Sequence, residues 1–323
     1  MGSEAHLIAC GPRADLTRVL DRAAARILDL ERMWSRFLAG SDVSALNRSP
    51  GRPVAVGAET VALVAEAVDA YWRTGGRFDP TVLGDVVRAG YDRDLASIGV
   101  PGTKPAPGAD AARSYRSGCP GIEVDALAGT VTLPPATGFD PGGLAKGLAA
   151  DWVSAQMVAD GAVGACANIG GDLCVIGESP QGEGWRIGIE PPGLSSHFAA
   201  SHPIAVIDLA AGGVATSTVA RRRWTAAAAG DRTTSGVEGG HGAREAHHVI
   251  DPRTGEPSCS DAVAVTVAAG HAVYAETLAT AALVAGVASG CTLLRDEGAV
   301  GVVVGQDGRQ HRIGLPPLTG AER

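Results

Sequence analysis

The chain has 323 residues, 45% of them hydrophobic, with a formal net charge of −8 and an isoelectric point near 5.5. This length and apolar content are enough to bury the core of one or two domains. The acidic charge argues against a broad electrostatic surface for nucleic acid or for an anionic membrane. An anionic ligand must therefore be held locally, by a metal ion, a helix N-terminus or a few cations.

The residues 6–10 predict a short strand at the start of the chain. The spacing of apolar residues then predicts a long amphipathic helix over 14–38 and a second helix over 60–72. The Pro- and Gly-rich segment that follows predicts a mobile loop over 99–120. Two short apolar runs, GIEVD (121–125) and TVTLP (130–134), predict a hairpin.

A helix is expected from about 143 to 160, followed by a strand-rich stretch that ends in GGVATST at 218. The Gly-rich segment 226–246 predicts a second mobile loop. A strand at 261–269 precedes an alanine-rich helix at 271–287, and a shorter helix and two strands follow it. Because the order lacks a regular βαβ rhythm, we predict a single α+β domain over 1–323, with mixed or antiparallel sheets flanked by helices.

The six cysteines are scattered, without a CxxC pair and without metal-ligand spacing to the histidines. We therefore expect neither a zinc site nor a disulfide scaffold. No apolar run approaches the length of a membrane span, and the N-terminus lacks a basic segment followed by an apolar one. These features predict no integral membrane segment. They also predict a cytoplasmic location for the sequence as given, unless an export or lipoprotein segment has been removed.

The stretch DPGGLAKGLAAD (140–151) places Asp140 and two glycines before a helix that carries Lys146. Glycines permit close approach of the backbone, so the free N–H groups of the first turn can face a phosphate. Lys104 and Lys146 are the only lysines of this arginine-rich chain, which makes a lysine here notable. The alternative is a helix that enters the core with Lys146 solvated in its first turn.

Three further motifs carry side chains of types that bind ligands or act in catalysis. NIGGD (168–172) places Asp172 at a glycine turn, which usually only fixes a hairpin. HHVIDPRTGEP (247–257) places His248 beside a short strand, where an imidazole is a credible base, although such a histidine is more often structural. Glu276 and Thr280 lie one helical turn apart and offer oxygen ligands suited to Mg²⁺, although such pairs are commonly surface decoration.

The order of the motifs along the chain is more specific than any one of them. The series resembles the ApbE-like FAD:protein FMN transferases, and its members are MGS (1–3), WSRFLAGSDVSALNRSPGRPV (34–54), GGRFDPTV (75–82), GYDR (90–93), DPGGLAKGLAAD, NIGGD, GVATS (213–217), HHVIDPRTGEP and AETLATAALVAG (275–286). The resemblance implies the ApbE-like, T-fold-related architecture.

The resemblance also implies a reaction. Such enzymes take FAD as substrate and use Mg²⁺, for which Mn²⁺ could substitute. They move the FMN moiety onto a Thr or Ser hydroxyl of an acceptor flavoprotein and release AMP. Two alternatives stay open, a Mg²⁺-dependent FAD pyrophosphatase giving FMN and AMP, and a non-catalytic FAD-binding or storage protein.

Carried over position by position, the resemblance implies a set of site residues. The positions that would contact FAD are Met1, Phe37, Arg77, Phe78, Asp79, Asp140, Lys146 and His248. The positions that would hold the metal are Gly143 and Ala279 through backbone carbonyls, and Glu276 and Thr280 through side chains. We expect Lys146 to neutralise the pyrophosphate and His248 to act as the base.

Two departures from the family pattern bear on this site. Glu276 stands where the family usually has an aspartate, which puts the metal geometry in question. Thr218 stands where a glycine is common and is followed by the arginine run RRRW (221–224), which puts the shape of that loop in question.

Overall fold

The computed structural model describes residues 3–94, 97–98, 118–182, 184–192, 203–226 and 244–316. At its centre lies a seven-stranded sheet with the strand order β1-β5-β6-β9-β14-β15-β16, in which every neighbouring pair is antiparallel. The strands are β1 (Ala5–Cys10), β5 (Gly164–Ile169), β6 (Asp172–Gly177), β9 (Gly212–Thr218), β14 (Ala262–Ala269), β15 (Val300–Gly305) and β16 (Gln310–Ile313).

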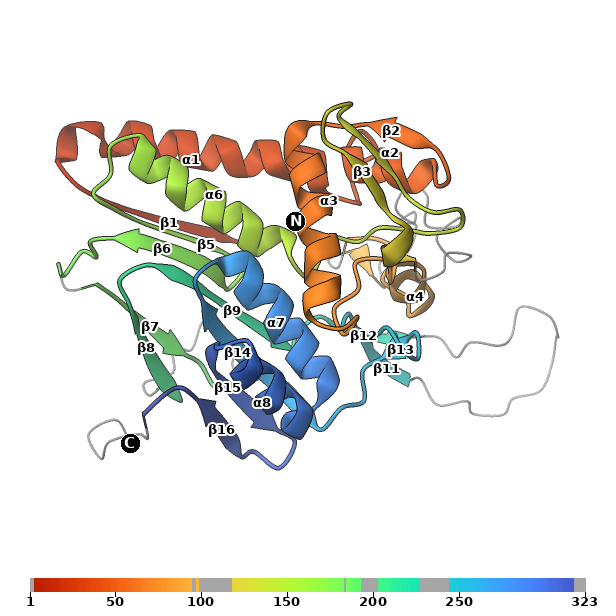
Figure 1. Cartoon of the computed structure of the whole chain (residues 1–323). Helices are drawn as coiled ribbons and strands as arrows, with labels where there is room; N and C mark the ends of the chain where they lie inside the picture. The colour runs from red at the N-terminus through yellow and green to blue at the C-terminus, as the bar shows by residue number, and fades with distance from the viewer. Residues whose placement is uncertain are drawn as a thin grey trace.

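Helices cover one face of this sheet (Figure 1). They are α1 (Arg13–Trp34), α6 (Ala145–Ala159), α7 (Ala272–Ala285) and α8 (Val287–Asp296). Helix α6 packs on β5 and β6, α7 packs on β9 and β14, and α1 lies across α6. A β-carbon at Gly213 would lie 2.1 Å from the Cα atom of Ala272, so the absence of a side chain lets α7 approach the sheet closely.

The opposite face of the sheet packs against a hairpin of β7 (Trp185–Ile189) and β8 (Ala205–Leu209). Strand β14 shows how the two faces are divided. Its Val265 and Val267 belong to the core beneath α7, whereas Ala264 and Ala268 belong to the core beneath the hairpin. This alternation follows from the two-residue period of a strand, and it makes the central strands apolar on both faces.

A second group of short elements, here called the side lobe, packs beside α1 (Figure 1). It comprises α2 (Asp42–Arg48), α3 (Ala58–Arg73), α4 (Leu83–Arg88), the 3₁₀ turn η2 (Cys119–Gly121) and a sheet of β2 (Pro53–Ala55), β4 (Thr130–Thr132) and β3 (Glu123–Asp125). Two small hairpins complete the described elements, β10 (Arg223–Ala226) with β11 (Arg244–His247) and β12 (Ile250–Asp251) with β13 (Glu256–Pro257).

The predicted α+β class with antiparallel sheets flanked by helices is confirmed. The helix predicted over 14–38 ends early, at Trp34, because Ser35 leaves the helical backbone conformation. The loops predicted over 99–120 and 226–246 fall mostly outside the described residues. Where they are described the prediction is partly wrong, because 119–120 belong to η2, 226 ends β10 and 244–246 belong to β11. In the described ranges no helix combines the length and apolar character that crossing a bilayer requires.

Candidate active site

A cavity of about 680 Å³ opens where the N-terminal end of α6, the middle of α7, the start of β6 and the end of β9 meet the side lobe. This volume falls within the range of small-molecule sites. Ten of the twelve predicted site residues line it, namely Phe37, Arg77, Phe78, Asp79, Asp140, Gly143, Lys146, His248, Glu276 and Thr280. Met1 lies outside the described residues, and Ala279 is fully buried in the core between α7 and the sheet.

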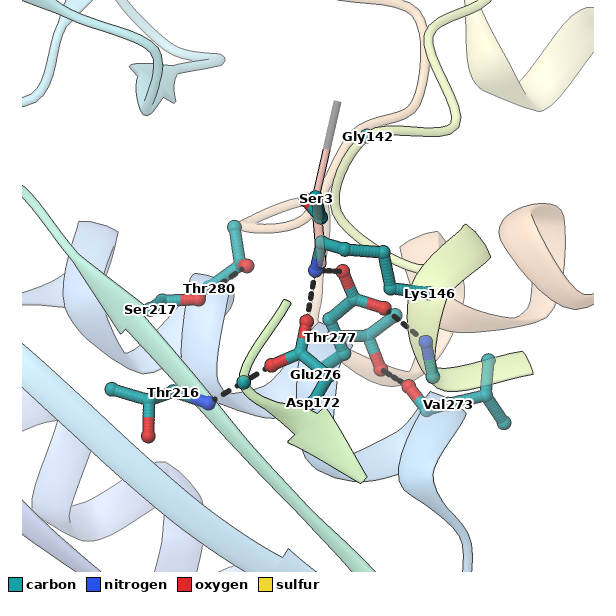
Figure 2. Close-up of polar contacts among 12 residues, drawn as sticks. Ser3, Gly142, Lys146, Asp172, Thr216, Ser217, Val273, Glu276, Thr277 and Thr280 are labelled. Carbon is teal, nitrogen blue, oxygen red and sulfur yellow. Dashed lines mark hydrogen bonds and ion pairs between the residues drawn. The ribbon is translucent and has the colours of Figure 1, made fainter. Parts of the chain in front are cut away.

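Lys146 lines this cavity and lies between two carboxylates (Figure 2). Its Nζ donates to Oδ2 of Asp172 and to Oε1 of Glu276. The side chains are 13%, 3% and 4% exposed, so Lys146 is not a solvated first-turn residue. Burial alone would lower the pKa of Lys146, but the two carboxylates raise it above its ordinary value, and the ammonium stays charged.

Each carboxylate is also held by a backbone N–H group. Oδ1 of Asp172 accepts from the N–H of Thr216 at 3.1 Å, and Oε2 of Glu276 accepts from the N–H of Gly147 at 2.7 Å. Burial raises the pKa of Glu276, and the neighbouring charge of Asp172 raises it further, while Lys146 opposes both effects. The three side chains therefore form a preorganised cluster, here called the Lys146 cluster, from α6, β6 and α7.

The junction between α6 and α7 explains why a glycine follows Lys146. A β-carbon at Gly147 would lie 2.5 Å from the carbonyl oxygen of Ala272, so only glycine lets the two helices meet here. The carboxylate of Asp151 then accepts from the N–H groups of Ala272 at 2.8 Å and Val273 at 3.0 Å. Asp151 thus caps α7 from α6 and fixes Glu276 relative to Lys146.

A group of oxygen donors lies beside the Lys146 cluster. Thr280 Oγ1 lies 2.8 Å from Ser217 Oγ, and a β-carbon at Gly143 would lie 3.7 Å from Thr280 Oγ1. Figure 2 shows Thr280 and Ser217 to one side of Lys146 and Glu276. Carboxylate, hydroxyl and carbonyl oxygens are the ligands that Mg²⁺ prefers. Gly143 and Thr280 bring oxygens of this kind close together, whereas both oxygens of Glu276 accept from Lys146 and from the N–H of Gly147. No described contact brings the carbonyl of Ala279 to this place.

The described parts of the chain contain no group of three or more His, Cys, Asp or Glu side chains that could hold a metal ion. A cation at this site would therefore draw on a carbonyl, a hydroxyl and oxygens of the substrate in addition to the one carboxylate of Glu276. Such mixed coordination is usual for Mg²⁺ at nucleotide phosphates.

The motifs RFDP and DPGG are brought together by backbone contacts. The N–H of Asp140 donates to the carbonyl of Pro80 at 2.7 Å. Asp79 accepts from the N–H of Thr81 at 2.7 Å, so its carboxylate shapes the turn at the cavity wall. Asp140 accepts from the N–H of Gly142 at 2.9 Å and pairs with Arg36 at 3.3 Å, so its carboxylate is also engaged.

One end of the cavity is aromatic. The Phe37 and Tyr91 ring centroids lie 5.7 Å apart, and Tyr91 stacks on Trp224 at 5.4 Å. The guanidinium of Arg36 lies 4.2 Å from the ring of Phe37 and 4.7 Å from that of Tyr91. Of these residues only Phe37 was predicted. Arg36 adjoins Phe37, but Tyr91 and Trp224 come from segments far from it in the sequence, so no local pattern groups the aromatic residues.

His248 is half-buried at the cavity wall. Among the described residues its buried Nδ1 atom has no hydrogen-bond partner, and the ring makes a hydrogen bond with the backbone of Arg222. Burial lowers the pKa of His248 to about 3, and the positive charges of Arg222 and Lys146 also oppose its protonation. The ring is therefore neutral near pH 7. The neighbouring His247 faces elsewhere, with Nε2 3.0 Å from the carbonyl of Ser258.

Sequence reasoning missed Asp172 and Arg222 as site residues. The NIGGD turn was visible, but nothing local shows that its aspartate meets Lys146. The arginine run was noted as a departure from a family pattern, and nothing local shows which of its arginines lines the cavity.

Comparison with known proteins identifies the family of this chain. The model of the ApbE family matches residues 1–304. The FAD:protein FMN transferase of Treponema pallidum is 28% identical over 305 residues, covering 88% of this chain and 76% of that protein. The protein of the same name from Salmonella typhimurium is 27% identical, covering 79% of this chain and 67% of that protein.

Solved structures share the fold. The ApbE protein of Thermotoga maritima superposes with a TM-score of 0.77 at 24% identity, over 97% of this chain and 94% of its own. The flavinyl transferase ApbE of Pseudomonas stutzeri, in its apo form, superposes with a TM-score of 0.71 at 22% identity, over 97% and 95%. With a family model that matches nearly its whole length, this chain belongs to the ApbE family.

Proposed function

We propose that this protein transfers the FMN moiety of FAD to a Thr or Ser hydroxyl of an acceptor protein and releases AMP, with Mg²⁺ at the site. Family membership and the names of the relatives support this reaction class. The observation that carries the proposal is the Lys146 cluster, because it sets a charged ammonium beside hard oxygen donors in a cavity of small-molecule size.

The metal would be held by Glu276, Thr280 and the carbonyl of Gly143. When bound, it would neutralise charge on the pyrophosphate, which is the main requirement of phosphoryl-type transfer. Lys146 would face the same pyrophosphate while its ammonium stays paired with Asp172. With the metal bound, the cluster would suit a dianionic group in a protein whose net charge is acidic.

The chemical step needs a base that is neutral before it acts. The acceptor hydroxyl oxygen forms a bond to the FMN phosphorus, the bond from that phosphorus to the bridging oxygen breaks, and AMP leaves with this oxygen. The hydroxyl proton passes to Nδ1 of His248, which is neutral and unpartnered among the described residues. Negative charge of a bound pyrophosphate would offset Arg222 and Lys146, which raises the pKa of His248 toward a value useful for a base.

One incubation tests the proposal. Purified protein is mixed with FAD, Mg²⁺ and an acceptor domain known to carry phosphoester-linked FMN, and the products are measured by mass spectrometry and by fluorescence of denatured protein. We expect covalent flavin on the acceptor together with an equal amount of AMP.

The other products identify the alternative functions. Free FMN with AMP, formed equally without the acceptor, would identify a pyrophosphatase with water as nucleophile. Unchanged FAD that stays bound to the protein would identify a binding or storage protein. Either result would overturn the proposed transfer.

A further inference from the structure

Arg222 lies in the cavity wall between β9 and β10 in an unusual backbone conformation. Its φ angle is 52°, in the left-handed region that residues with a β-carbon rarely adopt. Such a conformation persists only where the surroundings hold it, and it recurs at ligand sites. The observation prompts the question of what the side chain does there.

The contacts of Arg222 place its guanidinium at the cavity wall, near Lys146. Its Nη2 donates to Oγ of Ser3 at 3.2 Å, and Ser3 lies beside Lys146 (Figure 2). Its backbone makes a hydrogen bond with the ring of His248. Its positive charge also acts on Lys146 and on Tyr91. The guanidinium is thus close enough to Lys146 and to Tyr91 to act on both electrostatically.

The cations that line the cavity differ in how they are neutralised. Arg36 faces Asp140, Lys146 faces two carboxylates, and Arg221 faces Glu190 at 3.4 Å. Arg77 donates to a backbone carbonyl, that of Thr74. Like Arg77, Arg222 has no carboxylate partner in the described part of the chain, and its side-chain hydrogen bond goes to the neutral hydroxyl of Ser3, beside the Lys146 cluster.

A formal count of charge around Lys146 strengthens this contrast. The ammonium is offset by Asp172 and Glu276, which together carry the larger formal charge. Without a metal ion, the Lys146 cluster therefore offers no net attraction to a dianion. Among the described residues, Arg222 supplies a positive charge next to this cluster that no carboxylate offsets.

We propose that Arg222 binds phosphate oxygens of the nucleotide substrate and is a specificity-determining residue for pyrophosphate-containing ligands. The inference rests on the proposed function, since it names a side chain that binds the phosphates of FAD. A guanidinium presents several donors in a planar fork that matches phosphate oxygens, and it stays charged at all working pH values. Ser3 holds this fork in place before the substrate arrives.

The test compares Arg222→Asn with Arg222→Lys and with the control Arg223→Asn. Asparagine tolerates a positive φ better than most residues, so Arg222→Asn removes the cation without disturbing the turn. Arg223 is exposed and does not line the cavity, so its variant makes the same change in net charge outside the site. The equilibrium affinities for FAD and ADP are measured by calorimetry at several salt concentrations, with Mg²⁺ present and no acceptor.

We expect Arg222→Asn to weaken both ligands by about 10-fold to 100-fold, the range for loss of a charged hydrogen bond. The salt dependence of binding should become shallower, Arg222→Lys should recover part of the affinity, and Arg223→Asn should bind like the wild type. The inference is overturned if Arg222→Asn binds as tightly as Arg223→Asn. It is also overturned if affinity falls with unchanged salt dependence and no rescue by lysine, because that result indicates packing.

These outcomes are separable from failure of the proposed function. A wild-type protein that binds FAD through Arg222 but flavinylates no acceptor would contradict the transfer and leave the phosphate contact standing. A wild-type protein that binds neither FAD nor ADP would contradict both.

Discussion

Lys146 is the residue on which two buried carboxylates depend for their counter-charge. Lys146→Met keeps most of the side-chain volume and removes the ammonium, which leaves Asp172 and Glu276 buried without it. Breaking a buried ion pair from one side costs about 3–5 kcal/mol. We therefore expect a loss of about that size in the free energy of unfolding, measured with denaturant.

The double variant Lys146→Met with Glu276→Gln serves as the control for this prediction. It removes one of the two carboxylate charges that the loss of Lys146 leaves buried without a counter-charge, and it should regain part of the lost stability. A single variant that unfolds at the wild-type denaturant concentration would show that Lys146 is solvated in solution.

His248 gives the protein an acid-sensitive contribution to stability. Its pKa is about 3 when folded, against an ordinary value near 6.5, so the folded state favours the neutral ring. This contribution is fully present above pH 6.5 and is lost as the pH falls from 6.5 toward 3, by up to about 1.4 kcal/mol per pH unit. His248→Asn should flatten the pH dependence of unfolding over this window. Parallel curves for variant and wild type would contradict the burial of the ring.

Glu276 tests the metal assignment by a readout other than turnover. Mn²⁺ binding can be followed by electron paramagnetic resonance with ADP present. Glu276→Gln keeps the length and removes the charge, so affinity should fall by at least about 10-fold to 100-fold, as for loss of a group that supports a metal. Glu276→Asp keeps the charge but shortens the reach to the N–H of Gly147, and it should retain more affinity than the glutamine variant. Equal affinities for wild type and Glu276→Gln would remove Glu276 from the metal site.

At the scale of elements, the contact between α6 and α7 sets the geometry of the site. Gly147→Ala would place a β-carbon 2.5 Å from the carbonyl oxygen of Ala272, a backbone atom that cannot swing away. The helices must separate, at a cost of about 1–3 kcal/mol or more. We expect a lower melting temperature and weaker Mn²⁺ binding from the same substitution.

Gly270→Ala is the matched control for this experiment. Gly270 lies just before α7, and a β-carbon there would meet no atom within 4 Å. It should therefore melt like the wild type. If Gly147→Ala also melted like the wild type, the claim that α6 and α7 are too close here for a β-carbon would be wrong.

The elements that the sequence predicts well are those with a long periodic pattern. Helix α3 was expected within a few residues of its bounds, because its apolar residues recur at helical spacing over several turns. Helices α2 and α4 have seven and six residues, too few for such a pattern, and were missed.

The contacts within the site were also beyond what local sequence patterns can predict. Lys146 meets partners 26 and 130 residues away, and no local signal encodes either contact.

At the scale of the whole molecule, strand order is the feature that the sequence left open. Strand β1 pairs with β5, and β9 lies between β6 and β14, although other elements intervene along the chain. Period-two alternation identifies a strand but does not name its neighbour. The resemblance to a family supplied the set of site residues, and the folded sheet explains why ten of them line one cavity.

The whole protein should respond to FAD and metal as a coupled pair. The Lys146 cluster is anionic on balance before a cation binds, so a dianionic pyrophosphate and a divalent cation each improve the site for the other. A ligand at 100 times its dissociation constant stabilises the fold by about 2.7 kcal/mol. We expect the rise in melting temperature with FAD and Mg²⁺ together to exceed the sum of the rises with each alone, as measured by differential scanning calorimetry. Calcium should substitute less well than Mn²⁺, because Ca²⁺ takes about six to eight oxygen ligands and the proposed site supplies few from the protein. Additive shifts would show that the two ligands bind at independent places, and the metal would then have to be assigned to another part of the molecule.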